Sequence, residues 1–541
     1  MKMPAGTPTI HELPIETLMH IFRYLVKEEE VARPELREKY PPALILRSIC
    51  RRWNAVAKAT PELWLQLVGP YGIEWTRRAL TFSKELPLDL TILNRTAFYR
   101  GFKDISHSLP LLEAKLCRLR SLTLHLDSYP EIVPSDLQMA LLSSPLPMLE
   151  KLELYDGQSD SVYILDENTL SGEVPLQLKC LDVGSYVTIL PTCPILHAPL
   201  TSLCVYDTPI WKSTDEVLCT LSSLPQLETF YWGVTSSTYG SEMPFAALPL
   251  SASSEPNPKM VHLPRLQTMH LSGQIEIITY LFTHIAFPSS CAVKILAELD
   301  NLPLVNIGEL YPVLDVALGE RLQAAFPDDK EASGFETMTI ENFDDDFAVG
   351  ATLTWKDATS ASAPKSFTFG FLPIWDSDIP TLHPEALALI CHMLSQWPAT
   401  SRAVSRFHNN HGGLCLPNLE LEDQPWTRLL RLLSAVDSIT TIHREGVDGL
   451  VDVLASRSPN VVFPRLHRLT IQRANLTLAE FASLMSALKT LHTSSKEERK
   501  GTASSPPTLC LKWCSLDGVE IPDFHADLGV EYVGREEKLT G

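Results

Sequence analysis

The phrase LPMLEKLEL, residues 146–154, sets the pattern for most of this chain. A proline or loop residue leads into the spacing Leu-x-x-Leu-x-Leu, and the last two leucines point to one side of an extended strand because strand side chains alternate between faces. Successive copies between residues 122 and 269 lie 22 to 39 residues apart, which indicates an irregular repeat. Variants of the phrase occupy residues 119–126, 178–183, 200–206, 224–232, 263–271 and 463–471.

Helix-like apolar periodicity fills segments between several copies. Alternating strand, turn and helix predict an α/β solenoid, in which parallel strands line a concave face and helices cover the other side. The pattern resembles leucine-rich repeat domains, and we assign residues 110–525 to such a domain; an unrelated α/β domain is the alternative. Asp215 and Thr477 are the expected N-caps of two helices. The helix-like runs begin at Asp136, Asp215, Ile275, Pro384, Val447 and Leu478.

The region 290–380 lacks the Leu-x-x-Leu-x-Leu spacing, so the repeat there is either eroded or interrupted. Strand-like pieces are nevertheless expected at residues 291–297, 335–340 and 367–371. Polar or proline-rich composition predicts loops at residues 235–260, 356–366 and 494–507. Residues 526–541 are expected to form a flexible tail.

Composition and charge narrow the class of protein. The 541 residues are 45% hydrophobic and 20% charged, which is typical of a folded soluble protein. A formal net charge of −20 argues against nucleic acid as a partner, because such binding relies on basic surfaces. Eleven cysteines without a disulfide framework indicate a reducing compartment, cytoplasmic or nuclear. The longest uncharged stretch, residues 183–206, contains three prolines, so we expect no membrane span.

The N-terminal segment predicts a small helical module. Residues 14–25, PIETLMHIFRYL, have apolar side chains at helical spacing, with Pro14 suited to the first helical position. Residues 43–59, ALILRSICRRWNAVAKA, form a second helical run. Thr60 and Pro61 then predict the start of a short turn that carries Trp64. Residues 1–60 hold 10 Lys+Arg against 7 Asp+Glu, so this is the basic end of an acidic chain.

The order Leu-Pro, amphipathic helix, Cys-Arg-Arg-Trp and Pro-Glu-Leu-Trp resembles the F-box, and the resemblance covers residues 9–67. It implies binding to the Skp-type adaptor of SCF ubiquitin ligases, and through the adaptor to a cullin. Residues 26–42 depart from the family because they are longer and more charged than the usual connection. The alternative is an ordinary helical hairpin, in which these apolar residues form the hairpin's own core and bind no partner. The resemblance assigns adaptor binding to Leu13, Pro14, Ile21, Leu25, Ile49, Cys50, Trp53 and Trp64.

Motifs for catalysis, metals and cofactors are weak or missing. The chain has no G-x-G-x-x-G, G-x-x-x-x-G-K-[ST], G-x-S-x-G or H-E-x-x-H sequence. His408, His411 and Cys415 have a spacing that could bring metal ligands together, but their glycine-rich context favours a turn. Residues 344–346 are three aspartates, which more often form a solvated loop than a cation site. We therefore expect no catalytic residue, metal or cofactor.

Together the two resemblances predict the substrate-recognition subunit of an SCF-type ubiquitin ligase, which would select a protein substrate and catalyse nothing itself. A repeat scaffold or regulator without ligase output is the alternative. Side chains between and after the strand leucines would face the substrate, unless the register shifts by one residue and exchanges the faces. The expected substrate-binding residues are His125, Tyr155, Tyr206 and Tyr231.

Overall fold

The structure is a computed structural model, and it divides the chain into two compact units. Unit 1 comprises residues 1–212 and 219–230, and unit 2 comprises residues 213–218 and 231–541. The residues that the structure describes are 10, 12–32, 42–69, 71–92, 108–125, 141–155, 163–184, 187–208, 210–211, 213–233, 260–288, 290–298, 337–343, 348–355, 365–372, 404–409, 430, 433, 435–442, 450, 454, 463, 465–498, 508–512, 514–516, 519–520 and 531–533.

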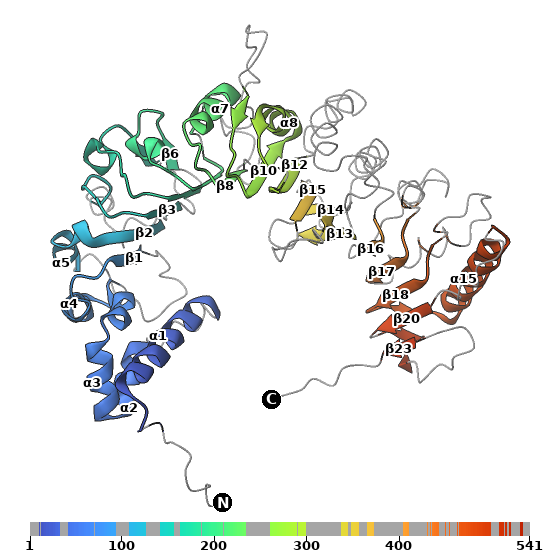
Figure 1. Ribbon diagram of the computed structural model, residues 1–541, viewed down its shortest axis with the longest axis horizontal. Coiled ribbons are helices and arrows are strands. Elements are labelled where there is room, and N and C mark those ends of the chain that lie inside the picture. The colour runs from blue at the N-terminus through green and yellow to red at the C-terminus, as the bar shows by residue number, and fades with distance from the viewer. Residues whose placement is uncertain are drawn as a thin grey trace, which may run out of the picture. The chain divides into compact units, whose positions relative to one another are not determined.

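Unit 1 begins with helices, drawn in blue in Figure 1, and continues with strands. We call α1, α2, α3 and η2 the N-terminal module. The elements are α1 (Ile15–Ala32), α2 (Pro42–Ile49), α3 (Arg51–Ala59), η2 (Pro61–Leu67), α4 (Ile73–Phe82), β1 (Leu88–Ile92), α5 (Leu109–Glu113), η4 (Leu116–Arg118), β2 (Leu119–His125), β3 (Lys151–Tyr155), β4 (Tyr163–Leu165), η5 (Thr169–Gly172), β5 (Cys180–Gly184), β6 (Val187–Ile189), η6 (Pro194–His197), β7 (Ser202–Tyr206), α7 (Thr214–Ser222) and β8 (Thr229–Gly233), the last two divided between the units.

The second predicted helix is broken at Cys50. This residue has an extended backbone (φ −159°, ψ 170°), and its Sγ accepts a hydrogen bond from the Trp53 N–H at 3.4 Å. Cys50 therefore ends α2 and caps α3, so the prediction of one continuous helix over residues 43–59 is wrong. The first helix begins at Ile15, one residue after Pro14, whose carbonyl accepts from the Leu18 N–H at 3.1 Å.

Aromatic side chains fill the core of the N-terminal module. The Phe22 and Trp53 rings lie with centroids 5.0 Å apart, and the Trp64 Nε1–H donates to the Ala57 carbonyl at 3.0 Å. Thr60 and Pro61 begin η2 as predicted, although Thr60 donates back to Val56 instead of capping η2 with its side chain. The buried core residues are Leu18, Phe22, Leu46, Trp53, Val56, Ala57, Leu63, Trp64 and Leu67.

The strands of unit 1 pair in parallel in the order β1-β2-β3-β5-β7. Before β3, β5 and β7 the carbonyl of the preceding residue accepts two backbone N–H groups from the next copy, and the donor–acceptor distances at Glu150, Lys179 and Thr201 are 2.7–3.0 Å. The same paired acceptance recurs in unit 2 at Ser405 and Asp437. A repeated main-chain contact thus accompanies the repeated leucine phrase in both units.

A buried arginine joins the helices of unit 1 to its sheet. Arg118, which is 5% exposed, immediately precedes β2. Its Nε and Nη2 donate to the Leu86 carbonyl at 3.0 and 2.6 Å, and Nη2 also donates to the Ser83 hydroxyl at 3.1 Å. Ser83 is the C-cap of α4. The guanidinium therefore satisfies acceptors at the end of a helix, where positive charge is favourable.

Unit 2 consists mainly of strands with two described helices. The elements are β9 (Val261–His262), β10 (Thr268–Gln274), α8 (Ile275–His284), β11 (Ile285–Ala286), β12 (Ala292–Glu298), β13 (Thr337–Phe343), β14 (Ala348–Trp355), β15 (Lys365–Leu372), β16 (Arg406–Asn409), β17 (Ser438–Ile442), β18 (Arg468–Gln472), β19 (Asn475–Leu476), α15 (Leu478–Glu498), β20 (Thr508–Lys512), β21 (Ser515–Leu516), β22 (Val519–Glu520) and β23 (Glu531–Val533). Figure 1 shows α15 beside β18 and β20.

An antiparallel meander interrupts the parallel pairing of unit 2. Strand β14 runs antiparallel to both β13 and β15, whereas β12 with β15 and β13 with β16 are parallel pairs. Three predicted strand pieces of the region 290–380 correspond to β12, β13 and β15, while β14 was not predicted. The sequence of β14, AVGATLTW, has no Leu-x-x-Leu-x-Leu spacing, so the repeat pattern could not reveal it.

Helix boundaries in unit 2 refine the predictions. Thr477 caps α15 as expected: its Oγ1 accepts from the Glu480 N–H at 3.2 Å, and Glu480 accepts from the Thr477 N–H at 2.7 Å. Ser213, not Asp215, caps α7, because its Oγ accepts from the Glu216 N–H at 3.3 Å. The runs predicted from Ile275 and Leu478 are α8 and α15. Those from Asp136, Pro384 and Val447 lie wholly or mostly outside the described residues.

Two predicted irregular regions contain regular structure. Helix α15 continues through residues 494–498, the first part of the loop predicted at 494–507. Strand β23 lies within the predicted tail, residues 526–541, and pairs in parallel with β20. Strand β23 is held by backbone pairing with Cys510–Lys512. The polar composition of the tail does not reveal such pairing, so the sequence did not predict the strand. The predicted loop 235–260 lies outside the described residues except for its last residue.

Candidate functional site

The N-terminal module has large apolar side chains on its surface. Ile45 and Ile49 lie one turn apart on α2 and are 47% and 52% exposed. Their neighbour Leu46 is buried, so α2 presents apolar side chains both to the core and to solvent. Isolated exposed apolar residues are common, but several on one small module indicate an interaction surface. We call the exposed large apolar residues of the module, together with Ile10 just before it, the apolar module surface: Ile10, Ile15, Tyr24, Leu25, Ile45 and Ile49.

A polar surface lies on the β-sheet of unit 1. In β3 and β7 the leucine and valine positions are buried and the intervening positions are half-buried. Backbone register aligns Thr123 with Glu153, Glu153 with Asp182, and Asp182 with Cys204. In the next row Gly184 aligns with Tyr206, and the Tyr155 ring lies against Gly184. We call these two rows the acidic–tyrosine surface: Thr123, Glu153, Tyr155, Asp182, Cys204 and Tyr206.

Two side-chain contacts hold Glu153 of the acidic–tyrosine surface. Its Oε2 accepts from the Thr123 hydroxyl at 2.6 Å, and its Oε1 lies 2.5 Å from the Lys151 Nζ. The Lys151–Glu153 ion pair is partly exposed, and such pairs contribute little to stability. These contacts fix the Glu153 carboxylate beside Asp182 on the next strand.

The negative charge of the buried Asp182 carboxylate is only partly compensated by neighbouring groups. Burial raises its pKa to about 6, although a hydrogen bond from Tyr155 opposes the shift. Its Oδ1 is buried and has no hydrogen-bond partner among the described residues. Burial, and then the charge of Asp182, raise the pKa of Tyr155, while burial raises the pKa of Cys204 to about 11. The tyrosine and the cysteine are therefore neutral hydrogen-bonding groups around a carboxyl group that titrates near pH 6.

Comparison with known protein families bears on the N-terminal module. An F-box-like family model matches residues 10–68. The match contains the whole of α1, α2, α3 and η2 and supports an F-box protein. No match was found among the curated proteins.

The structure places the predicted adaptor-binding residues in three environments within the F-box-like module. Pro14, Leu25 and Ile49 are exposed, the last two belonging to the apolar module surface. Half-buried positions are occupied by Leu13, Ile21 and Cys50. Trp53 and Trp64 are 7% and 0% exposed, so both indoles pack in the core of the module.

Four residues of the apolar module surface, Ile10, Ile15, Tyr24 and Ile45, were not among the predicted adaptor-binding residues. Ile15 lies in the first turn of α1, and Ile45 lies one turn before Ile49 on α2. A signal for Ile45 exists in the sequence, because residues 44–46 are three consecutive large apolar residues and a helix cannot turn all three toward one core. The spacing of Ile45 and Ile49 then indicates the exposed side of α2.

Three of the four predicted substrate-binding residues follow one row across the strands of unit 1. His125 pairs in register with Tyr155, and Tyr206 lies one strand beyond Gly184. Gly184 thus occupies the row position between the two tyrosines, and the Tyr155 ring covers it. Tyr231 belongs to unit 2, where its ring makes an edge contact with His270 at a centroid distance of 4.0 Å.

The weak metal candidates gain no support. Among the described residues no group of three or more His, Cys, Asp or Glu side chains is arranged to hold a metal ion. His408 lies in β16, where burial and Arg406 lower its pKa. His411, Cys415 and the aspartates at 344–346 lie outside the described residues. Within the described parts of the chain, no helix has the length and apolarity needed to cross a membrane.

Proposed function

We propose that this chain is the substrate-recognition subunit of an SCF-type ubiquitin ligase. In this proposal the F-box-like module binds a Skp-type adaptor, and through it a cullin, while the strand region selects a protein substrate. The observation that carries the proposal is the F-box-like match at residues 10–68 together with the exposed apolar side chains of the same module.

The apolar module surface is the proposed adaptor interface. Its side chains would bury apolar area against the partner, and each large aliphatic group that becomes fully buried contributes about 1.5–3 kcal/mol. Trp53 and Trp64 would support the interface from inside the module, because both are buried, Trp53 against Phe22 of α1 and Trp64 beneath Arg47 of α2. The excess of basic residues at this end of the chain would favour an acidic partner.

The proposed repeat type of residues 110–525 is the leucine-rich repeat. Support comes from the buried strand leucines, the parallel pairing and the recurring paired acceptance of N–H groups before the strands. We assign substrate recognition to the acidic–tyrosine surface, where two tyrosines provide rigid contact area and two carboxylates favour a basic segment.

A receptor of this kind would contribute proximity instead of catalysis. Holding the substrate near the ubiquitin-charged enzyme raises the effective concentration of the acceptor lysine. The proposal therefore includes no catalytic residue, cofactor or metal, no nucleic-acid or membrane partner, and a cytoplasmic or nuclear location.

Affinity purification of a paired charge variant tests the adaptor interface. Ile45→Asp with Ile49→Asp places two charges on α2, and we expect loss of both the adaptor and the cullin. The control is Ile164→Asp, because Ile164 is also exposed but lies on β4, outside the F-box-like match. Retention of the adaptor by the paired variant contradicts the proposal. Adaptor without cullin in the wild-type purification favours a scaffold without ligase output.

A second purification tests the substrate surface. Tyr155→Ala with Tyr206→Ala should keep the adaptor but lose proteins whose ubiquitination depends on the wild-type chain. Tyr155→Phe with Tyr206→Phe keeps both rings and should restore most of those partners if ring contact area dominates. Unchanged partners in the double alanine variant, with the fold intact by thermal unfolding, would remove this surface from substrate recognition.

A further inference from the structure

Four adjacent strands of unit 2 carry basic residues and no acidic ones. Strands β16, β17, β18 and β20 pair in parallel in that order and lie side by side in Figure 1. Their sequences, RFHN, SITTI, RLTIQ and TLCLK, contain two arginines, one lysine and one histidine but no aspartate or glutamate. The whole chain has 65 acidic against 45 basic residues, so these strands reverse its general charge. A local positive surface attracts ligands of negative charge.

The two arginines of these strands lie on the face that is turned away from the core. Phe407 and Leu469 are fully buried, whereas Arg406 and Arg468, each one residue earlier in the same strand, are exposed. Because strand side chains alternate between faces, the arginines and the buried residues point to opposite sides of the sheet. Both arginines can therefore be reached from solvent.

Backbone register places the two arginines in one row across the sheet. Arg406 pairs with Ser438, and Ser438 pairs with Arg468. The Cα atoms of the arginines are therefore two strand spacings apart, which is about 9.5 Å. In the next row on the same face, His408 pairs with Thr440. We call these residues the basic strand surface: Arg406, His408, Ser438, Thr440 and Arg468.

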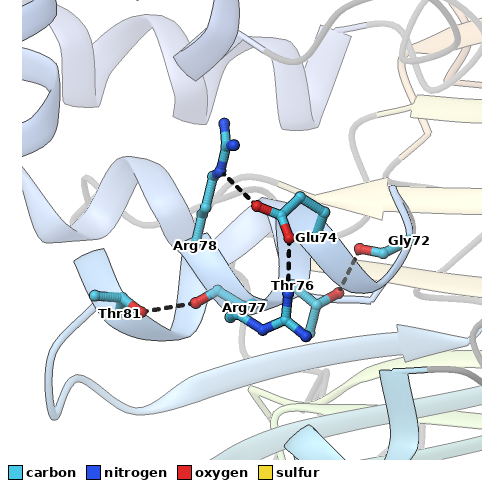
Figure 2. A network of polar contacts seen from close by, with 6 residues as sticks. All are labelled: Gly72, Glu74, Thr76, Arg77, Arg78 and Thr81. Atoms are coloured by element: carbon cyan, nitrogen blue, oxygen red, sulfur yellow. Dashed lines mark hydrogen bonds and ion pairs between the residues drawn. The ribbon is translucent and has the colours of Figure 1, made fainter.

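Two exposed arginines of unit 1 differ from Arg468, because they already share an acidic partner. Glu74 accepts from Arg77 Nη1 at 2.7 Å and from Arg78 Nε at 3.1 Å (Figure 2). No ion pair or side-chain hydrogen bond engages the Arg468 guanidinium within the described structure. An incoming anion would therefore bind Arg468 without displacing a partner from the same chain.

We propose that the basic strand surface binds an acidic segment of a partner protein, with carboxylates of that segment on Arg406 and Arg468. Guanidinium groups suit this ligand because their planar N–H donors match the two oxygens of a carboxylate. Since the arginines stand about 9.5 Å apart, two separate carboxylates fit them better than a single phosphate. The hydroxyl of Ser438, between the arginines, can donate to or accept from the main chain of the segment.

The basic strand surface is distinct from the acidic–tyrosine surface. The acidic–tyrosine surface belongs to unit 1 and favours a basic segment, so the two surfaces select ligands of opposite charge. Nucleic acid is also negatively charged, but the net charge of −20 on the whole chain opposes binding to a phosphate backbone. An acidic protein segment is thus the ligand that we assign. The assignment does not depend on adaptor binding, and its failure would leave the proposed function intact.

Fluorescence anisotropy with the full-length chain tests the basic strand surface. The probes are a labelled peptide with glutamate at alternate positions, the same peptide with glutamine instead, and a labelled oligouridylate of similar length. We expect the glutamate peptide to bind and the glutamine peptide not to bind. Arg406→Gln with Arg468→Gln should weaken binding at least about tenfold, because two charge pairs are lost together. Failure of the glutamate peptide to bind, or tighter binding of the oligouridylate, would overturn the proposal.

A matched pair of variants at Ser438 tests the row itself. Ser438→Asp places a negative charge between the two arginines and should weaken binding of the glutamate peptide at least about tenfold, because like charges repel. Ser438→Asn has nearly the same size without the charge, so it should change binding less than about twofold. Equal weakening by both variants would show that the charge of this row does not matter and would contradict the proposal.

Lys489→Gln is the control for general charge attraction. Lys489 is exposed and belongs to the same unit, but it lies on α15 and not on the strands. It should change binding less than about twofold, whereas Arg468→Gln should weaken binding about threefold to fivefold. Equal effects of Lys489→Gln and Arg468→Gln would remove the site from the strand face. Thermal unfolding of each variant shows whether the fold is retained.

Discussion

The rings of Phe22 and Trp53 meet inside the F-box-like module, with centroids 5.0 Å apart and planes inclined by 55°. Tilted aromatic pairs of this kind stabilise a core beyond the area that they bury. Phe22 comes from α1 and Trp53 from α3, so this contact ties together two helices on either side of α2 in the sequence. Trp53 is thus a core residue of the module as well as a candidate for adaptor binding.

Trp53→Ala should destabilise the F-box-like module. Removal of a buried tryptophan side chain costs about 3–5 kcal/mol, mostly from lost apolar burial and the cavity left behind. We expect a lower unfolding temperature together with loss of adaptor binding. Ile49→Ala should weaken adaptor binding while the unfolding temperature changes little, because Ile49 is exposed. Normal thermal stability of Trp53→Ala would show that the ring is dispensable for the core.

Asp182→Asn should stabilise unit 1 at neutral pH. The folded-state pKa of about 6 lies above the ordinary value of 3.8, so the folded state holds an extra proton between those values. Stability therefore falls as pH rises from about 4 to 6, and the loss is complete above the folded pKa. Asparagine removes the buried charge, so the variant should be more stable than wild type at pH 7.5.

The stability difference should shrink toward pH 4, which thermal unfolding at several pH values would measure. Glu153, Lys151, Tyr155 and Cys204 face the same carboxyl and remain unchanged in the variant. A difference between Asp182→Asn and wild type that is constant from pH 4 to 7.5 would contradict titration of Asp182.

Thr477→Ala should weaken the start of α15. The substitution removes the hydroxyl that accepts from the Glu480 N–H, and loss of such a cap costs about 1 kcal/mol. Amide hydrogen exchange should become faster in the first turn of α15. Thr490→Ala is a control within the same helix, because Thr490 is exposed and its hydroxyl donates to the Ser486 carbonyl one turn back, away from the cap. Unchanged exchange in Thr477→Ala would show that the cap is unnecessary.

Arg118→Met should destabilise unit 1 because it leaves the Leu86 carbonyl and the Ser83 hydroxyl without their charged donor. An unsatisfied buried polar group costs about 1–3 kcal/mol, and methionine supplies comparable apolar bulk but no donor. Chemical denaturation would measure the change. Arg120→Met is the comparison, because Arg120 forms a partly exposed ion pair with Asp89. Loss of that pair should lower the free energy of unfolding by less than about 1 kcal/mol. Equal effects would refute a special role for burial.

The alternation of leucines predicted which side chains of the unit 1 strands face the core, because burial of the paired leucines decides which face of the strand is turned inward. Leu152 and Leu154 are fully buried, and Glu153 between them is not, as the alternation requires. The sequence of β14 lacks the leucine spacing, so periodicity did not predict this strand. Its place in the sheet depends on antiparallel backbone pairing with β13 and β15, which the leucine pattern does not encode.

The candidate site was less accessible to prediction for two physical reasons. Helical periodicity passes unbroken through Cys50, so the sequence does not reveal that a thiol cap divides the helix there. Apolar spacing also cannot separate residues that face a partner from residues that face the module's own core. Trp53 and Trp64 are core residues while Ile45 is exposed, a distinction that depends on how α1, α2, α3 and η2 pack together.

Arg118 links the opening of α4 to the opening of β2. Its hydrogen bonds reach 35 residues back to Ser83 at the end of α4 and 32 residues back to Leu86. Separating the helix from the strand would leave these acceptors without their donor, so we expect the two elements to open as one cooperative unit.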